Sequence, residues 1–158
     1  MKSCSIVLLL AIIACNSAST NGLKSRADSV QPKSTAAYKP GLGEFMLGIQ
    51  VHHSKLWFAG INENWRLADF EIHEIGEALD DIQQFNSERP EVKSIHMIDG
   101  PIDSVNASIQ KKDLNSFKKN FILLTATCNN CHRDTDHGFN VIKIPDAPPF
   151  SNQDFKAK

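Results

Sequence analysis

Two cysteines and a histidine stand close together in the run Cys128-Asn129-Asn130-Cys131-His132. On a helix, residues three and four positions apart lie on one face, so these three side chains would project the same way. Two thiols on one face can each add to one vinyl group of a single porphyrin, and the adjacent imidazole can then bind its iron. This spacing is the one used for covalent haem attachment. We interpret it as a haem c site with His132 as the proximal iron ligand.

Other sites that use paired cysteines fit the surrounding sequence less well. A thioredoxin-like redox pair opens a helix within a βαβ unit, and no strand pattern precedes Cys128. A zinc site requires a second pair of ligands, but the chain has no second Cys-X-X-Cys pair. A disulfide between Cys128 and Cys131 on one continuous helix would have poor geometry.

Four segments with helical periodicity are expected to position this motif. Their apolar residues recur every three or four positions in stretches that begin near residues 43, 64, 101 and 114. Short links make neighbouring helices antiparallel, so we predict an all-α fold, an antiparallel four-helix bundle. The row on the fourth helix is Leu114, Phe117, Phe121, Leu124, Cys128 and Cys131. The cysteines continue the core row, which places the porphyrin between helices.

Further residues mark the ends and faces of these helices. Gly60 is the expected C-cap of the first helix, and Asn64 and Asp113 are the expected N-caps of the second and fourth. On the second helix, Glu71 and His73 are expected on the solvent-exposed face. Residues 86–100 contain helix-breaking proline and glycine, with room for a short helical turn at 92–97.

The opposite side of the iron depends on the first helix. If it runs antiparallel to the fourth, its start lies level with the motif, which makes Met46 the leading candidate on the distal side. His53 is on the same row, about 10.5 Å further along at 1.5 Å per residue. Core packing for Met46, or a buried imidazole hydrogen-bonded to a neighbour for His53, explains either residue equally well. His52 and His96 are on no clear row.

The N-terminal region has the pattern of an exported lipoprotein. Residues 1–14 combine a basic start with an apolar run too short to span a bilayer, as in a signal peptide. Cys15 follows at the position of a lipid-modified cysteine, and Asn16 in place of aspartate favours the outer membrane. Residues 15–40 are polar and read as a flexible tether. We therefore expect a periplasmic protein bound to the membrane only through a lipid anchor.

The helical pattern and the late motif together resemble class II c-type cytochromes, the cytochrome c′ and cytochrome b562 type of haem bundle. The resemblance covers residues 41–134, and the absence of a methionine after Met97 argues against the commoner small cytochrome c fold. The chain departs from this pattern after the motif, because 26 residues follow His132. We expect residues 135–158 to form an extended tail over the haem edge or the bundle end.

Three functions are compatible with these features. The first is one-electron transfer between partner proteins, with one haem c held by His132 and a sixth ligand such as Met46. The second, implied by the resemblance, is binding of nitric oxide or carbon monoxide at a five-coordinate iron. The third is a peroxidase-like activity assisted by His53, but no set of acid and base groups indicates an enzyme. A net charge of −1 argues against nucleic acid as a partner.

Overall fold

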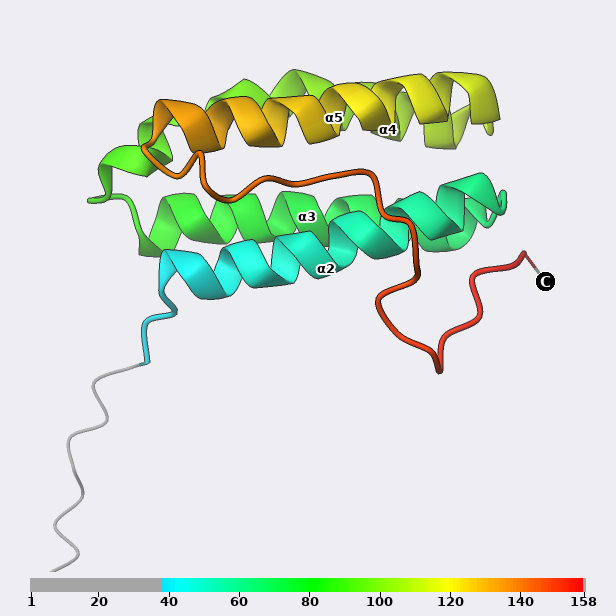
Figure 1. Cartoon of the computed structure of the whole chain (residues 1–158), viewed down its shortest axis with the longest axis horizontal. Helices are drawn as coiled ribbons and strands as arrows, with labels where there is room; N and C mark the ends of the chain where they lie inside the picture. Colours follow the sequence, from blue (N-terminus) through cyan, green and yellow to red (C-terminus); the bar gives the residue numbers. More distant parts are fainter. Residues whose placement is uncertain (1–37, 158) are drawn as a thin grey trace, which may run out of the picture. The chain divides into compact units, whose positions relative to one another are not determined.

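The structure, a computed structural model, describes residues 38–157. The predicted signal peptide, the predicted lipid-modified Cys15 and most of the predicted tether lie outside these residues. The described part contains α-helices and one 3₁₀ helix but no strand (Figure 1). The elements are α2 (Leu42–Ile61), α3 (Trp65–Phe85), η1 (Pro90–Ile98), α4 (Asp99–Gln110) and α5 (Leu114–Asp134). The all-α prediction is confirmed, and the helices lie where the periodicity placed them.

The helices pack in two pairs joined by short turns. Helix α2 packs against α3, and α4 packs against α5, while α3 also contacts α4 and η1 contacts α5 (Figure 1). Helices α2 and α5 contact each other less extensively than the two helices of either pair do. None of the helices within residues 38–157 is both long and apolar enough to cross a membrane.

Two of the predicted helix caps are confirmed, and the third is wrong. The side chain of Asn64 accepts a hydrogen bond from the amide of Leu67, and that of Asp113 accepts from two amides at the start of α5. Gly60, however, lies inside α2, and the left-handed residue that ends this helix is Glu63, with φ 56°. Gly60 is needed for another reason, because a Cβ at this position would overlap the ring of Phe117.

An aromatic cluster fills the core near the turn that joins α2 to α3. Phe117 and Phe121 of α5 are fully buried, and the Phe117 ring centre lies 6.3 Å from that of Trp57 and 6.1 Å from that of Trp65. The close approach of α2 and α5 at Gly60 lets the Phe117 ring lie against the α2 backbone. These contacts tie α5, and with it the motif, to the first two helices.

Glu71 contradicts its predicted exposed position. Its side chain is completely buried, with Oε2 2.7 Å from His52 Nδ1 and Oε1 2.5 Å from Lys55 Nζ. A buried carboxylate is stable only when paired, and α2 supplies both partners, the imidazole of His52 and the amine of Lys55. The helical pattern missed this because it reads every acid as solvent-exposed. The prediction for His73 is confirmed, since its side chain is exposed.

Residues 135–157, the C-terminal segment, form neither helix nor strand. The segment leaves the end of α5 and runs back along the helices, between α5 and α2 in the view of Figure 1. Ile144 packs against the core, and Phe155 is buried with its ring centre 5.8 Å from that of Phe58. Aromatic and apolar side chains thus hold the segment against the bundle.

Candidate cofactor cavity

The motif at the end of α5 opens on a cavity of about 790 Å³. Its walls come from α2, from Leu79 of α3, from η1, from the end of α5 and from the C-terminal segment. The apolar lining consists of Leu42, Met46, Leu47, Ile49, Leu79, Ile95, Ile98, Phe139, Val141 and Ile142. The volume lies within the range of roughly 300–1,000 Å³ that is usual for ligand and cofactor sites.

Cys128, Cys131 and His132 all line this one cavity. Both thiols are free and partly buried, and the Cys131 thiol lies 3.8 Å from the carbonyl oxygen of Ser94 in η1. Burial raises the pKa of Cys128 to about 11 and also raises the pKa of Cys131. The cysteines are therefore neutral thiols at neutral pH, facing a mostly apolar space.

The ring of His132 is oriented by the C-terminal segment. Its Nδ1 lies 2.7 Å from the carbonyl oxygen of Asn140, which can only accept a hydrogen bond, so Nδ1 carries the proton. In this tautomer the lone pair lies on Nε2. Metal-binding histidines commonly donate their other N–H in this way, which fixes the tautomer and makes the ligand more basic.

Met46 and His53 line the same cavity from α2. The structure thus brings both distal-side candidates to the space that the motif faces. Met46 is partly buried against the core, while His53 is buried, with 4% of its surface exposed. A methionine thioether needs no hydrogen bond in an apolar wall, whereas a buried imidazole does.

The hydrogen bonds of His53 define its protonation. Thr125 donates its hydroxyl proton to the Phe121 carbonyl, so it accepts from His53 Nε2 at 2.9 Å. His53 is then a neutral ring protonated on Nε2, and it lies tilted by 32° against the ring of Phe121 with ring centres 4.5 Å apart. Burial lowers the pKa of His53 to about 4, because it disfavours the charged form.

We expect this buried histidine to make folding stability depend on pH. Its folded-state pKa of about 4 lies below the ordinary histidine value of 6.5, so the unfolded chain binds the proton more readily. Stability from this group is complete above pH 6.5 and declines as the pH falls toward 4. Between pH 7 and pH 5 the loss is about 2 kcal/mol.

Urea denaturation of the cofactor-free protein at both pH values measures this loss. The His53→Gln variant should remove most of it, and His73→Gln, at an exposed position, controls for the removal of an imidazole as such. Equal pH dependence in the parent and in His53→Gln would show that His53 does not carry the effect.

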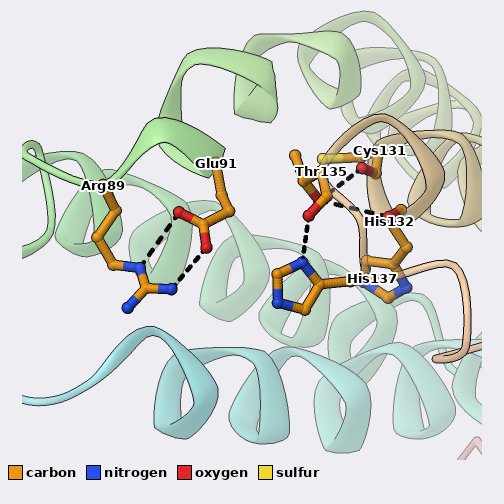
Figure 2. Close-up of polar contacts among 6 residues, drawn as sticks. All are labelled: Arg89, Glu91, Cys131, His132, Thr135 and His137. Carbon is orange, nitrogen blue, oxygen red and sulfur yellow. Dashed lines mark hydrogen bonds and ion pairs between the residues drawn. The ribbon is translucent and has the colours of Figure 1, made fainter.

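One end of the cavity is polar (Figure 2). Arg89 and Glu91, both lining residues, are joined by two hydrogen bonds of 3.2 and 2.5 Å, which lower the pKa of Glu91. His137 also lines the cavity and donates from Nδ1 to the carbonyl oxygen of Thr135 at 2.6 Å. The cavity therefore has a mostly apolar body and a charged end.

Other histidines are not part of this site. His52 pairs with Glu71, and His96 lies 3.2 Å from Asp99 on the exposed surface. Arg89 and Asn140 also line the cavity but were not predicted as members of the site, because they lie in segments without helical periodicity. Their proximity depends on the path of the chain, for which the sequence has no local signal.

Comparisons with known proteins add no relative, because neither a family model nor a curated protein nor a solved structure matches this chain. Among residues 38–157, no group of three or more histidine, cysteine, aspartate or glutamate side chains is arranged to hold a bare metal ion.

Proposed function

We propose that this protein is a single-haem c-type cytochrome that carries one electron at a time between partner proteins. The observation that carries the proposal is the common cavity, which both motif cysteines, His132 and Met46 line from two different helices. A haem c requires two thiols, a proximal imidazole and an apolar pocket, and these are the groups that the cavity supplies.

The lining of the cavity fits the polarity of the cofactor. A haem has a large apolar ring and two carboxylate side chains on one edge. The apolar residues of α2, η1 and the C-terminal segment would contact the ring. Arg89 at the charged end donates from Nε and Nη2 to Glu91, and its remaining N–H groups would bind a carboxylate. An arginine suits this role because its guanidinium is always charged and has five N–H donors, so it can bind a second carboxylate beside Glu91.

Each residue has a definable part in electron transfer. Haem iron, when bound, supplies the one-electron chemistry by alternating between its ferric and ferrous states. Cys128 and Cys131 would fix the ring to α5, and His132 would present the Nε2 lone pair that its hydrogen bond to Asn140 leaves free. Met46 would supply a neutral sulfur ligand, which favours the ferrous state. The apolar walls would face the ring on several sides and reduce its contact with water, which would limit the reorganisation that accompanies the change of charge.

Acid–acetone extraction tests the covalent attachment. We expect the red colour to remain with the precipitated protein, because thioether bonds to Cys128 and Cys131 survive acid. A b-type haem protein extracted in parallel should release its haem to the solvent. Colourless protein with all of the haem in the solvent would contradict the proposal.

The identity of the sixth ligand separates electron transfer from gas binding. If Met46 is a ligand, the ferric spectrum is low-spin and Met46→Ala makes it high-spin. If Met46 only lines the pocket, the parent is already high-spin, and Met46→Ala accelerates carbon monoxide binding without a change of spin. The second case is favoured by one observation, the mostly apolar cavity, which suits a neutral diatomic gas.

The corresponding His53→Gln variant is the matched test of the other candidate on α2. With Nε2 of His53 already donating to Thr125, we expect this variant to keep the spin state of the parent. A change of spin in His53→Gln but not in Met46→Ala would make His53 the sixth ligand and overturn the assignment to Met46.

A further inference from the structure

Asn129, one of the two residues between the motif cysteines, holds the C-terminal segment. Its side-chain oxygen accepts from the amide of Ile142 at 2.8 Å, and its Nδ2 donates to the carbonyl oxygen of the same residue, also at 2.8 Å. Nδ2 also donates to the Thr125 carbonyl oxygen at 3.1 Å. The amide side chain thus pairs with the backbone of Ile142 as a neighbouring peptide unit would. Such a two-point contact fixes both the position and the direction of the segment.

The segment that Asn129 holds also carries the acceptor of the His132 proton. Asn140, whose carbonyl oxygen lies 2.7 Å from His132 Nδ1, is two residues before Ile142. Between the helix and this point the chain makes a compact turn. The His137 amide donates to the His132 carbonyl oxygen at 2.7 Å, and the Asn140 amide donates to the His137 carbonyl oxygen at 2.9 Å. The turn is therefore held to α5 at both ends, by the His132 carbonyl oxygen at one end and by the Asn129 side chain at the other.

We propose that Asn129 is a positioning residue that docks the C-terminal segment over the end of α5 and so sets the orientation and basicity of the His132 imidazole. The inference rests on the proposed haem function, which it deepens. The hydrogen bond from Nδ1 to a fixed carbonyl gives the ring more imidazolate character. A more basic proximal ligand stabilises ferric iron and lowers the reduction potential.

The neighbouring Asn130 provides a matched control within the motif. Its side chain is exposed and accepts a hydrogen bond from Arg133 on the same helix, and no hydrogen bond from it to the C-terminal segment is found within residues 38–157. Asn129→Ala and Asn130→Ala therefore make the same chemical change, one residue apart, with and without loss of the contact to Ile142.

The reduction potential of the haem-loaded full chain is the main measurement. We expect Asn129→Ala to shift the ferric–ferrous equilibrium about tenfold toward ferrous iron, equivalent to a rise of about 59 mV for one electron. Asn130→Ala should keep the parent potential. A merely structural role would change unfolding but not the potential, so an unchanged potential in Asn129→Ala, or equal shifts in both variants, would overturn the inference.

Two measurements on the cofactor-free chain keep this test separate from that of the proposed function. Amide hydrogen exchange should show a protected Ile142 in the parent and in Asn130→Ala, with protection lost in Asn129→Ala. Nitrogen-15 chemical shifts should show the His132 proton on Nδ1 in the parent and in Asn130→Ala, and a mixture of tautomers in Asn129→Ala. A parent without covalent haem refutes the proposed function, whereas three proteins alike in exchange and tautomer refute the role of Asn129.

Discussion

The double variant Cys128→Ser/Cys131→Ser is expected to lose all covalently bound haem. Both thiols line the cavity, and a serine hydroxyl does not form the thioether bond. Each single variant should retain haem through its one remaining thioether, in lower yield. Haem-dependent peroxidase staining of a denaturing gel, together with the mass of the intact chain, measures the attachment in each case.

A variant elsewhere on α5 controls for the added hydroxyl groups. Ala126 is exposed on the same helix, so Ala126→Ser should stain as strongly as the parent. Haem staining that persists in the double variant would show attachment at another residue, and the assignment to Cys128 and Cys131 would then be wrong.

The second large effect concerns the fold that carries the motif. Gly60→Ala is expected to destabilise the protein by about 3 kcal/mol, since the new methyl group would overlap the buried ring of Phe117. The ring cannot move aside easily, because it packs against Trp57, Trp65 and Phe121. Urea denaturation followed by tryptophan fluorescence reports on this cluster directly.

Gly48 provides the matched control on the same helix. A Cβ at Gly48 would meet no atom within 4 Å, so Gly48→Ala should stabilise the protein by up to about 1 kcal/mol through helix propensity alone. Stabilisation by both substitutions would mean that α2 and α5 do not approach closely at Gly60.

Local patterns predicted the helices well because each pattern repeats many times. The apolar rows of α3 and α5 extend over several turns, and Asn64 and Asp113 carry the side chains that cap a helix. The two wrong predictions, for Gly60 and Glu71, arose where the environment of a residue depends on a neighbour distant in the sequence. Gly60 is small because of Phe117, and Glu71 is buried because α2 supplies its partners.

The candidate site was predictable to the extent that it resides in helices. The motif and Met46 were found by spacing and by the expected level of two antiparallel helices, and the structure places both on one cavity. Arg89 and Asn140 belong to irregular segments, whose paths depend on contacts remote in the sequence. Asn129 was visible within the motif, but its partner Ile142 was not, since no local pattern joins an exposed loop to a helix.

The order of residues along the chain has a consequence for how such a site is assembled. The C-terminal segment, which forms one wall of the cavity, follows the motif in the sequence. In a chain delivered from its N-terminus, α2, η1 and α5 are therefore available before the residues that cover them. The cavity is complete only once Ile142 has docked on Asn129, because that contact holds the last wall to α5.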